Sequence, residues 1–142
     1  MRENQLNISG KKILITGFGP FGNHIVNASW EAVKELSKLW PQSELCNIQL
    51  ITKQIPVSYE YVSTEISKLW EEHNPVIVIH VGVSYKASCL TIEHIAHSTG
   101  YARPDINDFA TVLMRIHQKV DAKLAFLMML EDICANIYFI NH

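Results

Sequence analysis

Three segments of the chain have the residue pattern of β-strands. Ile13–Thr16 is a short run rich in β-branched residues that stops at a glycine cluster, and Val76–Val81 is apolar on both faces apart from His80. Cys46–Leu50 instead alternates apolar with polar residues, which is typical of a half-buried strand at the edge of a sheet. The pattern therefore predicts two buried strands and one edge strand.

Between these strands, apolar residues recur at the spacing of amphipathic helices. The first helix is predicted between Asn27 or Ser29, either of which can cap its N-terminus, and Pro41, which prevents its continuation. The second follows Pro56 and keeps its apolar spacing as far as Trp70. This alternation predicts the α/β class: three layers, with a mostly parallel open sheet flanked by helices.

The character of the chain changes after Pro104. All six glycines and all five prolines precede residue 105. Beyond it, Phe109–Val120 has helical apolar spacing, and Leu124–Ile140 is apolar on most sides. We therefore expect residues 1–104 to form an α/β region and residues 105–142 to form a divergent, largely helical apolar tail of the same domain. The sheet would then be incomplete at its C-terminal side.

Composition and charge narrow the class of protein. Of the 142 residues, 48% are hydrophobic and 18% are charged, which excludes intrinsic disorder and favours one domain. The formal net charge of −2 gives no sign of a nucleic-acid or membrane-surface partner, and no apolar run reaches the ~18 residues of a membrane span. The first residues contain no apolar leader, and Cys46, Cys89 and Cys134 lack disulfide-framework spacing. We expect a cytoplasmic protein.

Residues Gly17–Gly22 match the G-x-G-x-x-G pattern and directly follow a predicted strand. One interpretation is a nucleotide-binding loop, which needs backbone N–H groups and a helix N-terminus at the phosphates. Against it, Pro20 has no N–H, the predicted helix begins near Asn27, and residues 50–52 offer no acidic side chain for a ribose hydroxyl. A tight turn between strand and helix is the alternative interpretation.

A third interpretation also accounts for the two phenylalanines of this cluster. Thr16–Gly22 together with Val26–Trp30 closely resembles the N-terminal signature of the pyroglutamyl-peptidase I family, cytosolic cysteine peptidases that remove an N-terminal pyroglutamyl residue. The resemblance spans about residues 11–104 and includes the motifs Ile55–Tyr59, His80–Ser84, Leu90–Glu93 and His97–Tyr101. It implies an open, mostly parallel α/β sheet and a peptide with an N-terminal pyroglutamate as the partner.

The resemblance assigns roles to three residues. Phe18 and Phe21 stand where the family's two loop phenylalanines enclose the flat lactam ring of the substrate, and aromatic faces recognise a small neutral ring without charge. Glu93 aligns with the glutamate that orients the catalytic histidine. Without the resemblance, the two phenylalanines indicate core packing, and Glu93 indicates a solvent-facing residue on an alternating strand.

The family's nucleophile and base lack clear counterparts. The family carries its cysteine in an Asp-Ala-Gly-x-Tyr-x-Cys segment and its histidine in a later His-Val-Pro strand, and neither segment occurs here. Cys134 is the candidate nucleophile, because Cys134–Phe139 is similar to the segment that begins at the family cysteine; a buried structural thiol is the alternative. None of the seven histidines matches the family base. Glu93, His94 and His97 form the pattern E-H-x-x-H, which reverses the H-E order of the zinc-binding motif H-E-x-x-H. We therefore expect no metal site, and we expect no cofactor.

These matches leave three hypotheses. The first is a pyroglutamyl peptidase that works through Cys134 and a substitute histidine. The second is a family member that keeps the ring pocket but is inactive or nearly so, as a truncated isoform or binding module, because a thiol without a positioned imidazole reacts poorly at neutral pH. The third, a nucleotide-binding protein that uses Gly17–Gly22, has the least support of the three. We favour the second, and we expect self-association through an exposed sheet edge.

Overall fold

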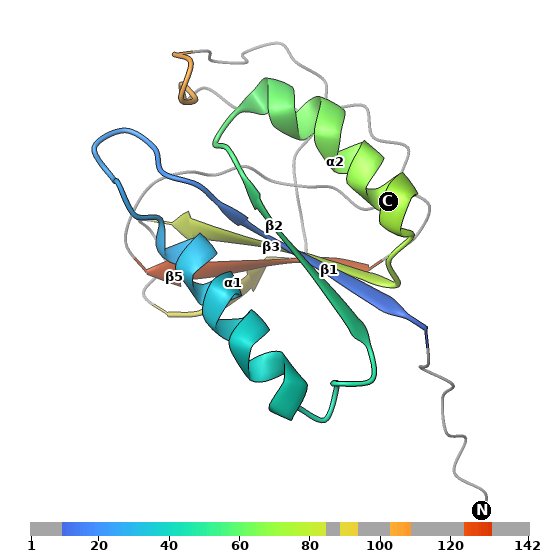
Figure 1. Ribbon diagram of the computed structural model, residues 1–142. Helices are drawn as coiled ribbons and strands as arrows, with labels where there is room; N and C mark the ends of the chain where they lie inside the picture. Colours follow the sequence, from blue (N-terminus) through green and yellow to red (C-terminus); the bar gives the residue numbers. More distant parts are fainter. Residues whose placement is uncertain (1–9, 85–88, 94–102, 109–123, 132–142) are drawn as a thin grey trace, which may run out of the picture.

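A five-stranded sheet lies at the centre of the computed structural model, which describes residues 10–84, 89–93, 103–108 and 124–131 (Figure 1). Along the chain the elements are β1 (Lys12–Phe18), α1 (Ala28–Leu39), a 3-10 helix (Trp40–Gln42), β2 (Gln49–Ile55), α2 (Tyr59–His73), β3 (Ile77–Ser84), β4 (Thr91–Glu93) and β5 (Leu124–Glu131). The strand order is β2-β1-β3-β5-β4, in which neighbours are parallel except β4, which runs antiparallel to β5. The predicted open, mostly parallel sheet is confirmed.

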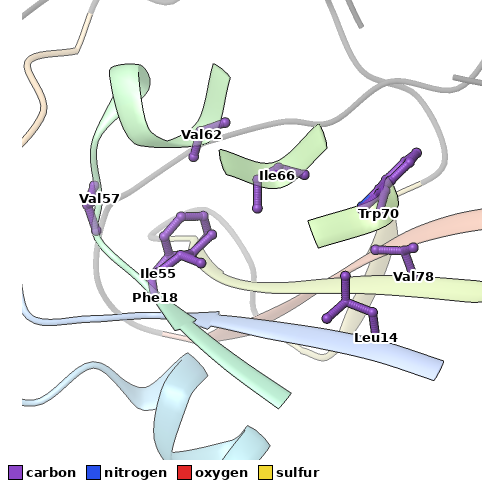
Figure 2. Packing of buried hydrophobic residues seen from close by; sticks show 8 residues of the cluster. All are labelled: Leu14, Phe18, Ile55, Val57, Val62, Ile66, Trp70 and Val78. Carbon is purple, nitrogen blue, oxygen red and sulfur yellow. The ribbon is translucent and has the colours of Figure 1, made fainter. Parts of the chain in front are cut away.

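Helices α1 and α2 cover opposite faces of this sheet. On the α2 face, Leu14 and Val78 of the sheet lie in one fully buried cluster with Ile66 of the helix (Figure 2). On the other face, Ile13 of β1 packs in a second cluster with Val33 of α1. Because side chains alternate along a strand, neighbouring residues of β1 contribute to both cores. The predicted three-layer arrangement is confirmed.

Both helices begin at polar caps. The side-chain oxygen of Asn27 accepts a hydrogen bond from Ser29 N at 3.0 Å, so Asn27 rather than Ser29 caps α1. Ser58 caps α2 and accepts a hydrogen bond from Tyr61 N at 3.3 Å. Asn74 ends α2 in a left-handed conformation with φ of 45°, as is common at helix C-termini. Among the described helices, none has the length and apolar character needed to cross a membrane.

The edge strand begins further along the chain than predicted. Two turns precede it, in which Cys46 N donates to Ser43 O at 3.2 Å and Ile48 N donates to Leu45 O at 2.9 Å. These N–H groups are satisfied within the turns, and β2 accordingly begins at Gln49 rather than at Cys46. Its place at the edge of the described sheet is confirmed.

The helix predicted from Leu124 onward is wrong over Leu124–Glu131. These residues form β5, which pairs in parallel with β3 along its whole length. A run that is apolar on both sides suits a strand inside a parallel sheet as well as a buried helix, and periodicity alone does not separate the two. Residues 109–123 and 132–142 lie outside the described residues, and the division at residue 104 stays a prediction.

Candidate functional site

The connection from β1 to α1 leaves the sheet at its carboxyl edge, the edge at which ligands bind in open α/β sheets. Phe18 and Ile55 lie opposite each other in the parallel register, and each ends its strand there. Gly19 N donates a hydrogen bond to Ile55 O at 2.8 Å. This bond holds the start of the connection against the end of β2. Residues 17–24 are called the phenylalanine loop below.

A tight turn forms the end of the phenylalanine loop. Backbone hydrogen bonds join Phe21 and His24 in both directions, at 3.2 Å from Phe21 N to His24 O and 2.9 Å from His24 N to Phe21 O. Gly22 adopts a φ of 52°, a left-handed conformation that glycine reaches without steric cost. The turn places the rings of Phe21 and His24 with their centroids 5.2 Å apart, and both side chains are half-buried.

The two phenylalanines predicted to contact a ligand ring lie at different depths. Phe18 is 1% exposed and belongs to the core cluster with Ile55 and Val57 on the α2 face (Figure 2). Phe21 is half-buried and packs against the same cluster. The loop therefore brings both rings to one apolar cluster, but only Phe21 keeps a substantial surface that a ligand can reach.

Two buried polar side chains at the start of α1 bond to the backbone of the phenylalanine loop. Ser29 Oγ accepts a hydrogen bond from Phe18 N at 2.9 Å and donates one to Asn27 Oδ1 at 2.8 Å. Asn27 Nδ2 donates to Gly19 O at 2.9 Å. The sequence identified Asn27 and Ser29 only as helix caps. Their place within the Val26–Trp30 motif was the one signal that they have a further role.

The contacts at the start of α1 count against nucleotide binding. Ser29 N is bonded to Asn27 Oδ1, and the N–H groups of Trp30 and Glu31 donate to Asn27 O at 3.1 and 3.2 Å. A phosphate bound at a helix N-terminus needs free N–H groups of this first turn. The helix also begins at Ala28, well beyond Gly22. The glycine pattern is thus better explained by packing and turn geometry.

The N-terminus of α2 is occupied by a carboxylate from the chain itself. Asp105 Oδ2 accepts a hydrogen bond from Tyr59 N at 3.0 Å, and Ile106 N donates to Val57 O at 3.0 Å. The Tyr59 hydroxyl donates to Arg103 O at 2.9 Å. Burial, and then the nearby Asp105 carboxylate, raise the pKa of Tyr59. Residues 103–108 therefore fill the position that a bound anion would take on this helix.

Of the two predicted catalytic residues, Glu93 and Cys134, the structure describes only the backbone of Glu93. Glu93 ends β4, and through β5 its backbone lies in the same row of the sheet as His80 and Thr16. That row is two residues short of Phe18 at the carboxyl edge of β1. Cys134 and the side chain of Glu93 lie outside the described part of the chain, so their catalytic roles stay predictions.

His80 is held as a neutral imidazole inside the sheet. Its Nδ1 atom lies 2.7 Å from Thr16 Oγ1, and its ring stacks on that of Trp70 with centroids 6.3 Å apart. The side chain is 1% exposed, and desolvation lowers its pKa from 6.5 to about 3. A histidine with so low a pKa is a poor general base at neutral pH. The position of His80 inside a strand agrees with the strand pattern of the sequence.

The described residues hold no group of three or more His, Cys, Asp or Glu side chains arranged to bind a metal ion. His94 and His97, which prompted the metal interpretation, lie outside the described residues. The expected absence of a metal and of a cofactor stays a prediction. Cys46 and Cys89 are exposed free thiols.

Comparison with known proteins gives one consistent result. A pyroglutamyl peptidase family model matches residues 11–130, which extends the sequence motifs beyond residue 104 into β5. Pyroglutamyl-peptidase 1 of human and of rat is 48% identical over 91 residues, or 64% of this chain and 42% of the relative. Pyrrolidone-carboxylate peptidase of Bacillus licheniformis is 39% identical over 100 residues, or 70% of this chain and 45% of the relative. The chain thus spans less than half the length of these relatives.

Solved structures show the same similarity in three dimensions. The crystal structure of Bacillus amyloliquefaciens pyroglutamyl peptidase I superimposes with a TM-score of 0.64 at 33% identity, covering 79% of this chain and 53% of the other. Pyrrolidone carboxyl peptidase from Thermococcus litoralis superimposes with a TM-score of 0.61 at 30% identity, covering 78% and 49%. The α/β arrangement described above is therefore similar to that of known pyroglutamyl peptidases.

Proposed function

Because the chain belongs to the pyroglutamyl peptidase family, we propose that it binds peptides with an N-terminal pyroglutamyl residue and that the lactam ring lies against the phenylalanine loop. The observation that carries the proposal is the position of Phe21. Its half-buried ring packs on the apolar cluster around Phe18, beside the carboxyl edge of a parallel sheet. This is the edge at which the α/β architecture binds ligands.

The chemistry of the loop favours a neutral ring over a charged N-terminus. Residues 17–24 contain two phenylalanines and no Asp, Glu, Lys or Arg. A lactam has apolar edges and a flat amide that aromatic faces accept, whereas a protonated amine placed here would lose its hydration without gaining a counter-charge. The loop therefore supports binding of pyroglutamyl peptides and rejection of prolyl peptides, which have a ring of the same size and a charged nitrogen.

The first prediction concerns Phe21. We expect Phe21→Ala to weaken binding of a short pyroglutamyl peptide by about tenfold or more, since a lost aromatic contact of about 1.4 kcal/mol already corresponds to tenfold. Calorimetric titration of the wild-type protein and the variant, each with the pyroglutamyl peptide and its prolyl counterpart, measures the effect. The prolyl peptide should bind both proteins weakly.

Leu69→Ala is the matched control for this variant. Leu69 is also half-buried and packs against the same cluster, but it lies near the C-terminal end of α2. It should reduce stability while leaving the affinity for the pyroglutamyl peptide unchanged. Equal affinity of the wild-type protein for the two peptides, or an unchanged affinity in Phe21→Ala, would overturn the proposed recognition.

We further propose that the 142-residue polypeptide hydrolyses pyroglutamyl peptides slowly or not at all. A cysteine peptidase needs a thiolate, a base positioned beside it and a group that orients the base. The segment Met128–Leu130, which precedes Cys134, stands where the family has Asp-Ala-Gly, and it forms part of β5. His80 is buried and neutral, so it does not supply the missing base. Binding without efficient turnover is the activity that these features support.

The second prediction is the outcome of a turnover assay. We expect a fluorogenic pyroglutamyl amide to be released by the wild-type chain at the same background rate as by Cys134→Ala and Glu93→Ala, because losing a member of a catalytic triad costs several orders of magnitude. Enzymatic turnover that both substitutions abolish would contradict this prediction. It would identify Cys134 as a working nucleophile and Glu93 as the residue that orients the base.

Self-association through a sheet edge also remains a proposal. Strand β2 ends the described sheet on one side, so among the described residues one row of its backbone groups has no partner strand. Lys53 on this strand is exposed, and an exposed charge on an edge strand opposes such pairing. Association through this edge is therefore expected to be weak.

A further inference from the structure

We propose that Asn27 and Ser29 are positioning residues that set the orientation of the phenylalanine loop toward its ligand. The inference rests on the proposed recognition of a pyroglutamyl ring and assigns to these two residues a role beyond capping α1. Neither residue contacts the ring in this proposal. They act through the backbone of Phe18 and Gly19, to which Phe21 is joined by Pro20.

The hydrogen bonds of these two side chains form a closed circuit with the loop backbone. Phe18 N donates to Ser29 Oγ, Ser29 Oγ donates to Asn27 Oδ1, and Asn27 Nδ2 donates to Gly19 O. Asn27 is 4% exposed and Ser29 is fully buried. Water therefore does not readily replace these bonds, and a lost partner leaves a buried polar group unsatisfied.

The circuit has only one arrangement of donors and acceptors. The single hydroxyl proton of Ser29 goes to Asn27 Oδ1, so its oxygen is left to accept the N–H of Phe18. A flipped amide at Asn27 would turn its NH2 group toward Ser29 N–H and its oxygen toward Gly19 O, which opposes donor to donor and acceptor to acceptor. The network therefore allows one assignment of its hydrogen bonds, and all of them form with the loop in the position described here.

The peptide groups around Gly19 are held from two sides. Gly19 N donates to Ile55 O at the end of β2, while Gly19 O accepts from Asn27 at the start of α1. Glycine otherwise rotates freely about its backbone bonds. Fixing it at this point determines how far Phe21 lies from the core cluster that contains Phe18. Phe21 is the ring of the loop that a ligand can reach, so its position is what the ligand depends on.

Substitutions at position 27 separate capping from loop positioning, and they give the third prediction. Asp caps a helix as well as Asn does, so Asn27→Asp keeps the acceptor for Ser29 N. It removes the NH2 group and turns a carboxylate toward Gly19 O. We expect α1 to remain folded by circular dichroism, while the Kd of the pyroglutamyl peptide rises by about tenfold or more. Ser29→Ala should raise it similarly, and Ser29→Thr, which restores a hydroxyl, should recover part of the affinity.

Ser58→Ala is the matched control, because Ser58 is a buried serine that caps the other helix and makes no bond to the loop. It should lower the melting temperature but leave the Kd within about twofold of the wild-type value. An unchanged Kd in both Asn27→Asp and Ser29→Ala, or an equal rise in Ser58→Ala, would overturn the positioning role.

Hydrogen exchange without ligand distinguishes failure of this inference from failure of the proposed function. In Ser29→Ala, the amide of Phe18 should exchange about tenfold or more faster, while amides in α2 stay protected. If the wild-type protein binds no pyroglutamyl peptide but this local acceleration occurs, the recognition proposal fails and the control of the loop by Ser29 stands. Uniform acceleration across the protein, or none, would refute the control of the loop.

Discussion

Gly17→Ala is expected to lower the free energy of unfolding by about 2–4 kcal/mol, because α1 must move away from the sheet to accommodate one methyl group. A Cβ atom at this position would lie 2.8 Å from Trp30 Cα and 2.9 Å from Ser29 O. Both are backbone atoms of the first turn of α1, which cannot rotate out of the way as a side chain can. Urea unfolding followed by circular dichroism measures the change.

Gly19→Ala, two residues along the same loop, is the control for this fourth prediction. The nearest atom to a Cβ there is Gln54 Nε2 at 3.5 Å, an ordinary contact with the end of a side chain. We expect a change of less than about 1 kcal/mol. If Gly17→Ala were as stable as the wild-type protein, the close approach of α1 to β1 would be wrong. If both variants lost stability equally, the effect would belong to the loop rather than to the helix contact.

The fifth prediction is a loss of stability in acid caused by His80. Burial lowers its pKa to about 3 in the folded protein, whereas in the unfolded chain the imidazole titrates near its ordinary value of 6.5. Between these values the unfolded chain binds a proton that the folded protein does not. Stability is therefore greatest above about pH 6.5 and falls by about 1.4 kcal/mol per pH unit as the pH decreases toward 3.

A non-titrating variant isolates this contribution from that of the carboxylates. His80→Asn places an amide where Nδ1 of the imidazole now meets Thr16 Oγ1. The free energy of unfolding of both proteins is measured from about pH 7 to 4. Its slope with pH should differ between them by about 1.4 kcal/mol per pH unit, which corresponds to one bound proton. A wild-type protein with the same pH dependence as the variant would show that His80 is not buried in its neutral form.

Local patterns were sufficient to predict the part of the fold that surrounds the site. The runs in β1 and β3 are short and rich in β-branched residues, a pattern that is typical of a strand buried inside a parallel sheet. The first helix was predicted to begin at Asn27 or Ser29 and to stop before Pro41, and the second to follow Pro56; in the structure α1 spans Ala28–Leu39 and α2 spans Tyr59–His73. These signals are local in sequence. A local preference predicts the folded structure correctly when the tertiary contacts favour the same conformation.

Two features depended on contacts that the sequence does not display. Leu124–Glu131 is a strand because β3 and β4 offer it backbone partners, and no residue within the segment indicates this. The start of β2 was placed too early because Cys46 and Ile48 alternate with polar residues, although their N–H groups are bound in turns. Periodicity reports which faces are apolar, not which backbone groups are already paired.

The sequence named candidate site residues, whose roles stay predictions, but it did not indicate how deeply each of them is buried. The family motif identified Phe18 and Phe21 together, yet only Phe21 remains partly open, because Phe18 completes the core under α2. The bonds from Asn27 and Ser29 to the loop connect residues eight and eleven positions apart. A helix cap and a loop anchor look identical in sequence, and only the fold shows that one side chain serves both.

Recognition by the phenylalanine loop is best tested by the nuclear Overhauser spectrum of the protein, with 13C-labelled phenylalanine, mixed with a short pyroglutamyl peptide. We expect cross-peaks between the lactam ring protons and the ring of Phe21, which disappear in Phe21→Leu and are absent with the prolyl peptide. Cross-peaks to other phenylalanines without any to Phe21, or binding of the peptide with no lactam contact to the loop, would contradict this mode of recognition.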